Sequence, residues 1–527
     1  MLTNPSLDLG RRRFAFSLLS TAAAAIPGPL FAADESAPAC ADVAASFARS
    51  LAAGTAPWTR ALLGIAADVE PMPMRLTGRW PAALAGALYR NGPARHGLGG
   101  LRYAHWFDGD GAVQQYSIGP RGVMHRARFV QTEKYAADSA AGRPVRHSYG
   151  TRVPGGEPLR SPDDLNVANT NVLAHGGRLL ALWEGGSAIE LDPKTLATRG
   201  AVRFSDELAG MPFSAHPRIE PDGTMWNFGA SFLHGVLVIY RIGADGRLAQ
   251  HHVLHVPDLP MLHDFVVTER HLVFLLPPFV LDIERVKGGA TLHDGFVWRP
   301  ELGMRAMVLD KARLDAKPKW FELPAGFVFH FGNGCEDGGV IRLDCMRSAS
   351  GWQVRQGMQE LMCGRYEPQD HAQATLVELD LSSGTRARAR QTVLPLAAEF
   401  PRVDQRFTGR AYRQVFATAM VGVAPRPGYD AVVRIDVQSG RMDRYVYGDD
   451  VLVEEHVFVP KEDAASRASS SAPREGQGWL VGTALDLARG ETMLSVFEAT
   501  NLAAGPLAQA RMPRLMPLAW HGSFVPA

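Results

Sequence analysis

Hydrophobic and polar residues alternate over short stretches along most of this chain. Residues 376–384 and 432–440 show the pattern most clearly, since in each an alternating run of apolar residues ends in Ser-Gly. Residues 188–193 and 238–246 carry looser versions that end in Pro or Gly. A period of two residues followed by turn-forming residues predicts short strands. No segment keeps a helical period for long, so the pattern predicts an all-β protein.

The spacing of these segments narrows the architecture. Gly384 and Gly440 end the two clearest copies, and they lie 56 residues apart. That distance fits one blade of a β-propeller plus an insertion. The repeat is weak, so from pattern alone a β-sandwich or a pair of barrels stays open. A chain of 527 residues is compatible with a single large β domain.

Composition excludes several classes of protein. With 46% hydrophobic and 21% charged residues, the chain is neither disordered nor collagen-like. The formal net charge of +1 argues against a nucleic-acid partner. Four Cys without a Cys-x-x-Cys pair exclude a disulfide scaffold and a zinc ribbon. Cys335, Cys345 and Cys363 lie close together in the sequence, and whether any pair bonds is open.

The N-terminus is typical of an export signal. Arg11-Arg12-Arg13-Phe14 precedes an Ala-rich run to Ala33 that Pro27 and Pro29 interrupt. This pattern predicts a twin-arginine signal over residues 1–36 and a periplasmic location; the alternative is a basic tail on an Ala-rich helix. We expect an N-terminal extension over 37–71 and one domain over 72–527. Because twin-arginine export carries folded proteins, a metal could be loaded before export.

Four histidines stand in surroundings that predict burial. They are His216, His263, His330 and His521, each flanked by apolar or small residues. A buried His must satisfy its ring nitrogens or bind a metal, and singly each is more often a core residue. Gaps of 47, 67 and 191 residues exclude a single helix or hairpin as their support. Innermost strands of separate propeller blades would bring them to one axis.

Seven motifs, in order from about residue 72 to the end, give the chain a family resemblance. They are Gly86-Ala-Leu-Tyr-Arg-Asn-Gly-Pro93, His105-Trp-Phe-Asp-Gly-Asp-Gly111, Phe129-Val-Gln-Thr-Glu-Lys-Tyr135, Ser214-Ala-His216-Pro, Leu262-His263-Asp-Phe-Val-Val-Thr268, His330-Phe-Gly-Asn333-Gly-Cys-Glu336-Asp and Pro517-Leu-Ala-Trp-His521-Gly. Together they resemble the carotenoid cleavage oxygenase family. The resemblance implies a seven-bladed β-propeller with a helical and loop cap over an axial site. That site would hold one non-haem Fe²⁺ per chain.

The same resemblance assigns roles to particular residues. His216, His263, His330 and His521 match the iron ligands, and Glu184, Glu399 and Glu455 match the carboxylates that orient them. A surface position is the alternative for each Glu. Glu184 is expected within an apolar strand, whereas Glu455 has Glu454 beside it and His456 where a Pro is usual. No residue beyond the metal centre is expected to act as acid or base.

Trp183, just before the first of these Glu residues, bears on the substrate. Stilbene cleavers of the family have a Lys at this position, which meets a phenol. An aromatic wall suits a polyene instead and favours a carotenoid or apocarotenoid that is cleaved with O₂ to carbonyl products. A stilbene or phenylpropanoid oxygenase remains an alternative, as does a metal-free propeller that only binds a ligand.

Residues 271–281 form the most apolar run outside the N-terminal segment. Its first half, through Leu276, predicts a buried strand that Pro277 and Pro278 end. Phe279, Val280 and Leu281 follow, either as a buried connection or as an exposed patch for peripheral membrane contact.

Overall fold

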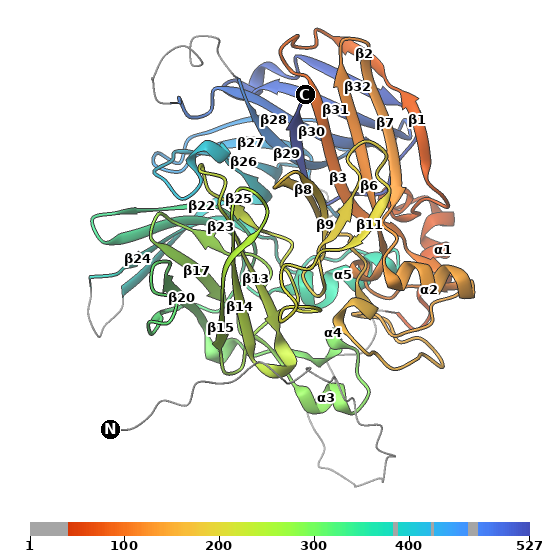
Figure 1. Cartoon of the computed structure of the whole chain (residues 1–527). Helices are drawn as coiled ribbons and strands as arrows, with labels where there is room; N and C mark the ends of the chain where they lie inside the picture. The colour runs from red at the N-terminus through yellow and green to blue at the C-terminus, as the bar shows by residue number, and fades with distance from the viewer. Residues whose placement is uncertain (1–39, 383–387, 423–425, 462–472) are drawn as a thin grey trace, which may run out of the picture.

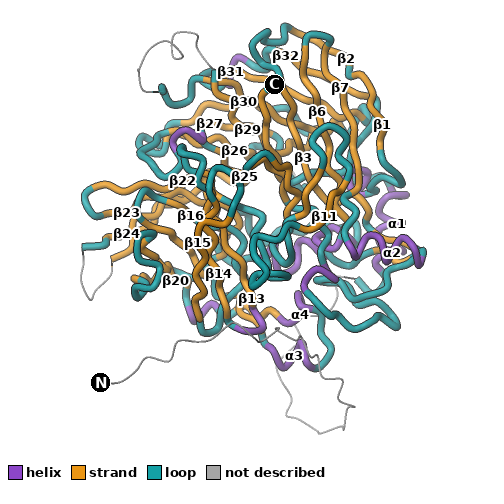
Figure 2. Tube along the Cα trace, viewed as in Figure 1, coloured by secondary structure: helices purple, strands orange, loops and turns teal. Residues whose placement is uncertain are grey.

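The computed structural model describes residues 40–382, 388–422, 426–461 and 473–527, and strands dominate them (Figure 1, Figure 2). A mostly-β fold is thereby confirmed. The predicted export signal, residues 1–36, lies outside the described residues. In the described part of the chain, no helix is long and apolar enough to cross a membrane.

Six antiparallel sheets of four or more strands build the described part of the body. The first has the order β1 (Val69–Pro73), β7 (Gly122–Phe129), β6 (Asp110–Gly119), β3 (Gly86–Arg95) and β33 (His521–Pro526). The second has β11 (Thr198–Ala201), β10 (Ile189–Leu191), β9 (Arg178–Leu182) and β8 (Asn171–His175). The third has β12 (Arg218–Ile219), β13 (Met225–Ser231), β14 (Val236–Ile242) and β15 (Leu248–His255). The four alternating segments of the sequence lie in or overlap such strands.

The second half of the chain supplies the other three sheets. The fourth has β16 (Val266–Val267), β17 (His271–Leu276), β20 (Met304–Asp310) and β21 (Lys319–Leu323). The fifth has seven strands: β22 (Phe327–Asp337), β23 (Val340–Ser348), β24 (Gln373–Asp380), β25 (Arg388–Arg402), β26 (Gln414–Met420), β27 (Ala431–Asp436) and β28 (Met442–Val446). The sixth has β2 (Arg75–Gly78), β32 (Ala508–Met512), β31 (Glu491–Glu498), β30 (Gly478–Asp486) and β29 (Val451–Pro460). Two hairpins, β4 (Gly97–Leu98) with β5 (Leu101–Arg102) and β18 (Phe279–Leu281) with β19 (Phe296–Trp298), complete the strands.

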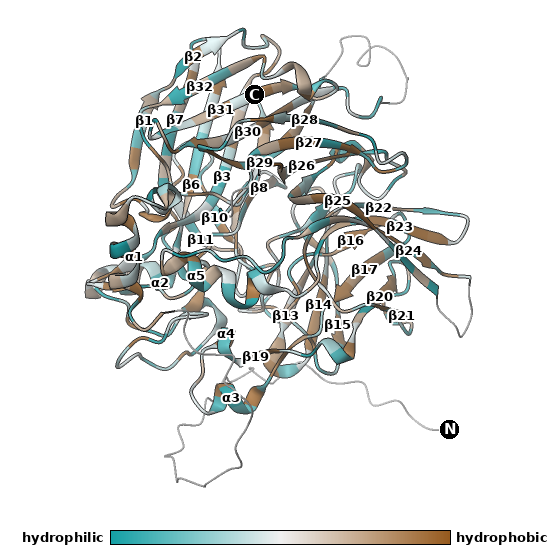
Figure 3. Cartoon of the chain, turned by 180° about the vertical axis from the view of Figure 1, so that it is seen from behind, coloured by the Kyte–Doolittle hydropathy of each residue, from teal (hydrophilic) through white to brown (hydrophobic). Residues whose placement is uncertain are grey.

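The hydrophobic core lies between the sheets rather than at one centre. Each sheet shares a cluster of buried apolar side chains with the next, from the first to the sixth. The sixth sheet then packs back on the first, where Val481 shares a cluster with Leu88. Because a middle strand is covered on both faces, its pattern becomes continuous: every residue of β30 is buried. Apolar residues accordingly gather on strands around the centre, among them β26 and β29 (Figure 3).

Both ends of the described chain are tied into sheets with distant partners. Strand β33 pairs with β3, and β2 pairs with β32. In Figure 1 the N-terminal strands therefore lie beside the C-terminal ones. This pairing brings His521, the first residue of β33, into the middle of the molecule.

The α-helices gather on one side of the sheets (Figure 1). They are α1 (Val43–Ala53), α2 (Glu133–Ala141), α3 (Ile283–Lys287), α4 (Leu292–Gly295) and α5 (Met358–Met362), the last preceded by a π-helical turn, η6 (Gln353–Gly357). Short 3-10 turns are η1 (Pro57–Leu62), η2 (Trp106–Asp108), η3 (Pro162–Leu165), η4 (Phe232–His234), η5 (Pro300–Leu302), η7 (Gln405–Phe407) and η8 (Leu502–Ala504). Helix α1 begins where the Asp42 side chain accepts from the Ala45 N–H, and it ends at Gly54, whose φ of 68° is left-handed.

The apolar run after His263 behaves as a buried connection. Strand β17 ends at Leu276, directly before the two prolines, as predicted. Phe279 in β18 is only 2% exposed and packs against Phe296. Val280 and Leu281 are half-buried in the same hairpin. Of the two alternatives, the buried connection holds for Phe279 and the exposed patch is wrong there, because its ring packs among Met261, Phe296 and Phe327.

Candidate metal centre

Four buried histidines converge at the centre of the molecule. One ring nitrogen from each of His216, His263, His330 and His521 lies within 4.8 Å of the others. The His216 and His263 Nε2 atoms are 2.9 Å apart, and those of His263 and His330 are 3.3 Å apart. His216 and His263 precede β12 and β16, His330 lies in β22, and His521 begins β33. The structure thus brings together all four predicted histidines from four different sheets.

Three carboxylates stand behind three of these rings. Glu184 Oε1 is 2.9 Å from His263 Nδ1, Glu399 Oε2 is 2.5 Å from His330 Nδ1, and Glu455 Oε1 is 2.8 Å from His521 Nδ1. Glu184 follows the end of β9 rather than lying within a strand. Glu399 lies in β25, and both Glu454 and Glu455 lie in β29. Only Glu455 of this pair meets His521, because Glu454 accepts from the Ala519 N–H instead. Each predicted Glu therefore meets a different histidine.

This arrangement fits a metal cation. A carboxylate that accepts from Nδ1–H leaves the Nε2 lone pair directed away from it, toward the other rings. Several lone pairs that meet in a buried space repel one another unless a cation lies between them. Imidazole nitrogen is a ligand that suits iron among other transition metals.

Burial keeps most of these rings neutral. It lowers the pKa of His330 and of His521 to about 3 and that of His216 well below its usual value. Burial opposes a charge on His263 too, but Glu184 outweighs it and raises the pKa of that ring. Neutral imidazoles are the form that coordinates a metal.

The three carboxylates differ in their electrostatic surroundings. Burial raises the pKa of Glu399 to about 8. Burial would raise the pKa of Glu455 as well, but Arg402, His521 and Arg90 outweigh it and lower the pKa below its usual range. These neighbours therefore favour the charged form of Glu455, whereas burial favours the neutral form of Glu399.

An apolar cavity of about 140 Å³ ends at three of the histidines, His263, His330 and His521. Its wall includes the aromatic rings of Trp106, Phe107, Trp183, Phe327, Phe329, Phe400, Tyr429 and Trp520, with Met358 and Leu361 from α5. Trp183 also lines a second apolar cavity of about 150 Å³, which shares Phe107 and Glu184 with the first. No Lys or Arg is among the described residues that line either cavity. Polar residues in the lining of the first cavity include Gln353, Tyr366, Asp370 and His371.

Sequence reasoning missed several of these wall residues. Phe329 and Phe400 stand next to a predicted ligand and a predicted carboxylate, so their positions carried a usable signal. The short helix α5 carried none, because five residues cannot establish a helical period.

A disulfide joins Cys40 to Cys363, a pairing that the sequence did not indicate. Cys335 and Cys345 are free, although they are close in sequence. They lie on the paired strands β22 and β23, where Cys335 faces Arg342 and Cys345 faces Phe331. Because neither Cys lies opposite the other, the hairpin keeps the two thiols apart.

Fold and site together define a mostly-β protein with a four-histidine metal-binding group. A family model described as "RPE65: Retinal pigment epithelial membrane protein" matches residues 65–526. The chain therefore belongs to the RPE65/carotenoid cleavage oxygenase family, as its motifs predicted.

Individual relatives cover almost the whole chain. Apocarotenoid-15,15'-oxygenase of a Synechocystis strain is 30% identical over 463 residues, which span 85% of this chain and 91% of the relative. The solved structure of cobalt-substituted Synechocystis ACO is 27% identical with a TM-score of 0.78, covering 89% of this chain and 98% of its own. Pseudomonas brassicacearum lignostilbene dioxygenase is 26% identical with a TM-score of 0.78, covering 90% and 99%.

Proposed function

We propose that this protein is a non-haem iron(II) oxygenase that cleaves a conjugated C=C bond of a carotenoid or apocarotenoid. One O₂ and one C=C bond give two carbonyl groups, so the atoms balance. The observation that carries the proposal is an apolar cavity that ends on His263, His330 and His521, three of the four converging histidines. Membership in a family of carotenoid and apocarotenoid oxygenases supports it.

The chain's own residues have separate tasks in this reaction. His216, His263, His330 and His521 would hold one iron, and bound Fe²⁺ would supply the redox chemistry with O₂. Glu184, Glu399 and Glu455 would orient three of the rings and raise their basicity. The apolar wall would exclude water and align the polyene. No side chain has to transfer a proton, because a C=C bond that becomes two C=O groups needs none.

The wall of the cavity favours a neutral polyene over a phenol. A phenolate would need a cationic partner in an apolar site, and neither cavity has a Lys or Arg in its described lining. Trp183, 6% exposed, occupies the wall instead. Cleavage of a stilbene or phenylpropanoid remains the second candidate, because a lignostilbene dioxygenase and an isoeugenol monooxygenase are among the relatives.

Metal analysis followed by product analysis tests this proposal. We expect about one iron per folded chain, and pairs of carbonyl products by mass spectrometry after incubation with apocarotenals and O₂. Cleavage of hydroxystilbenes or isoeugenol with none of apocarotenals would overturn the substrate assignment. A folded protein that takes up no iron and releases its ligand unchanged would be the metal-free binding propeller.

We also propose that the sheets are the blades of a seven-bladed propeller. Five sheets would be one blade each, and the seven-stranded sheet would be two blades that share the 15-residue strand β25. Packing of each sheet on the next, and of the sixth on the first, supports a ring. The helices on one side would form the cap. An experimental structure in which the sheets stack without a common axis would refute this arrangement.

Export to the periplasm is part of the same proposal, with a signal over 1–36, an extension over 37–71 and one domain from 72. The Cys40–Cys363 disulfide supports it, since such bonds persist in oxidising compartments. Changing Arg11 and Arg12 together to Lys should retain the protein in the cytoplasm on cell fractionation. Periplasmic recovery of that variant at the original level would contradict the twin-arginine route.

Substrate uptake from a membrane would need another surface than Phe279. Leu233 is 38% exposed and lines the second cavity, so it is the better candidate for peripheral contact. Liposome co-sedimentation of the Leu233→Ser variant beside the original chain tests this: equal pelleting of both folded proteins would exclude Leu233.

A further inference from the structure

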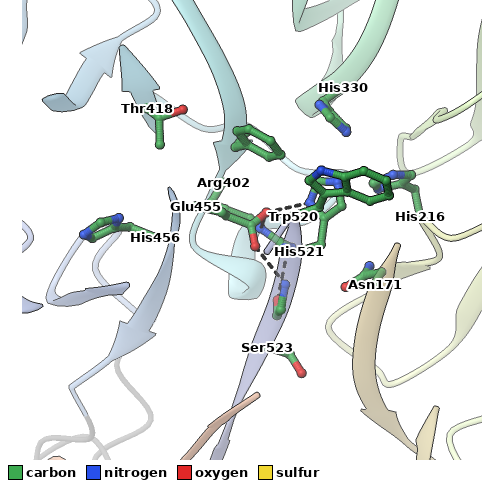
Figure 4. Close-up of polar contacts among 12 residues, drawn as sticks. Asn171, His216, His330, Arg402, Thr418, Glu455, His456, Trp520, His521 and Ser523 are labelled. Atoms are coloured by element: carbon green, nitrogen blue, oxygen red, sulfur yellow. Dashed lines mark hydrogen bonds and ion pairs between the residues drawn. The ribbon is translucent and has the colours of Figure 1, made fainter. Parts of the chain in front are cut away.

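Two arginines, Arg90 and Arg402, bind Glu455 and the backbone beside His521, the metal-ligand candidate nearest the C-terminus. Figure 4 shows Arg402, Glu455 and His521. Arg90 comes from β3 and is completely buried, and Arg402 ends β25 with a side chain 24% exposed. Neither residue belongs to the four histidines or to the three carboxylates behind them. Both nevertheless reach the same carboxylate and the same short stretch of backbone.

The first group that they bind is Glu455. Arg90 Nη1 donates to Glu455 Oε2 at 2.8 Å, and Arg402 Nε donates to Glu455 Oε1 at 2.7 Å. Glu455 Oε1 is also the atom that faces His521 Nδ1. The Gly522 N–H donates to Oε2 at 2.9 Å, so both carboxylate oxygens are fully engaged.

The second group is the backbone on either side of His521. Arg90 Nη2 donates to the carbonyl oxygens of Ala519 and Trp520, at 3.4 and 3.1 Å. Arg402 Nη2 donates to the carbonyl oxygen of Gly522 at 2.9 Å. The two guanidinium groups therefore hold the main chain before and after the histidine as well as the partner of its ring.

The other two histidine–carboxylate pairs lack this arrangement. Glu399 accepts from the Phe400 N–H and His330, and its Oε1 has no partner among the described residues. Glu184 has His263 and a long contact of 3.5 Å to Thr170. Neither carboxylate has an arginine among its described hydrogen-bond and ion-pair partners.

The position of His521 in the fold explains why it needs more support. Strand β33 is the end strand of its sheet and pairs with β3 alone. It is also the last strand of the chain, and terminal edge strands open most easily. His330 also lies in an end strand, β22, but that strand has 11 residues and continues on both sides of the histidine, whereas His521 is the first residue of β33.

We propose that Arg90 and Arg402 are positioning residues that fix His521 as an iron ligand and limit how strongly it donates to the metal. This inference rests on the proposed iron site. Both guanidinium groups donate to Glu455. Its carboxylate therefore accepts a weaker hydrogen bond from His521 Nδ1–H than a carboxylate without cationic partners would. Loss of one arginine would release the backbone on one side of His521 and strengthen the hydrogen bond from its Nδ1–H to Glu455.

Arg402→Gln and Arg90→Gln test both consequences, with Arg402→Lys as the conservative variant. We expect the Gln variants to bind iron about 10–100-fold more weakly in chelator competition. We also expect their Fe³⁺/Fe²⁺ potential to fall, because a more basic His521 stabilises the ferric state. Arg402→Lys keeps the positive charge but loses the second hydrogen bond, which goes to the Gly522 carbonyl. Its potential should therefore lie closer to that of the original chain than its iron affinity does.

Arg413→Gln is the matched control. Arg413 pairs with Asp436 at 2.6 Å, but it is half exposed and belongs to neither the histidine group nor its carboxylates. It should lower neither iron affinity nor potential. Thermal unfolding of the metal-free proteins then separates loss of fold from loss of the site.

A double-mutant cycle with Glu455→Gln identifies the route of the effect. If Arg402 acts through Glu455, its removal in the Glu455→Gln background should change the potential little further. Unchanged affinity and potential in folded Arg402→Gln and Arg90→Gln, or full additivity in the cycle, would overturn the inference. Failure of the original chain to bind iron would instead refute the proposed function.

Discussion

Replacing Cys40 by Ser would cut the covalent link between the N-terminal helix and the wall of the apolar cavity. Cys363 directly follows α5, whose Met358 and Leu361 line the cavity. Helix α1 adds two hydrogen bonds to the same turn: Ser46 Oγ to the Cys363 carbonyl at 2.9 Å and Ser50 Oγ to the Gly364 carbonyl at 2.7 Å. The disulfide therefore holds α1 against the turn that follows α5, beside one wall of the cavity.

The magnitude follows from the length of chain that the bond closes. The two cysteines are 323 residues apart in the sequence. In the chain-entropy account a loop of that length removes roughly 19 cal/mol/K, or about 5.8 kcal/mol at 25 °C, from the unfolded state. In other proteins, removal of a native disulfide typically lowers the free energy of unfolding by less, about 2–5 kcal/mol. Unfolding entropy of about 2.1 cal/mol/K per residue makes each kcal/mol worth roughly 1 °C in a chain of this size.

We therefore expect Cys40→Ser to lower the melting temperature by about 2–5 °C in scans at one heating rate. Reductant should lower the melting temperature of the original chain by a similar amount and leave Cys40→Ser unchanged. The unfolded, unreduced protein should show two free thiols, Cys335 and Cys345. Four free thiols, or an equal response of both proteins to reductant, would refute the reasoning.

The remaining predictions concern the centre and its cavity. His263→Ala or His330→Ala should abolish iron binding and cleavage while the far-ultraviolet spectrum keeps its β character; full iron content in either would contradict the ligand assignment. Glu399→Gln should cost about 10–100-fold in iron affinity or rate, and an unchanged iron content and rate would exclude the role of Glu399. Trp183→Lys should weaken apocarotenal cleavage, since a charge in the apolar wall costs several kcal/mol, and equal rates would exclude Trp183 from the wall. Iron at 100 times its dissociation constant should stabilise the fold by about 2.7 kcal/mol, and equal melting of the iron-free and iron-bound protein would exclude a site specific to the folded state.

The grouping that the sequence predicted is present in the structure, and for the histidines it follows from ordered motifs that each contain one of them. All four histidines meet, and each predicted Glu faces a different ring. Alternation also predicted strands such as β24 and β27. Local patterns did not decide contacts between segments that are separated in the sequence. These contacts are the partner of Cys40, the burial of Phe279 against β19, and the part of the cavity wall that α5 contributes. Such contacts follow from how sheets pack, which no short segment encodes.

The site and the closure of the fold depend on each other. His216, His263 and His330 come from successive sheets, whereas His521 arrives only when the last strand pairs with β3 near the start of the chain. The four-histidine group is therefore incomplete until β33 has paired with β3. Arg90 strengthens this link, because it stands on β3 and binds the backbone at the start of β33. A metal held by all four rings would join His521, at the start of β33, to three rings from the middle of the chain, so its binding would also stabilise the pairing of β33 with β3.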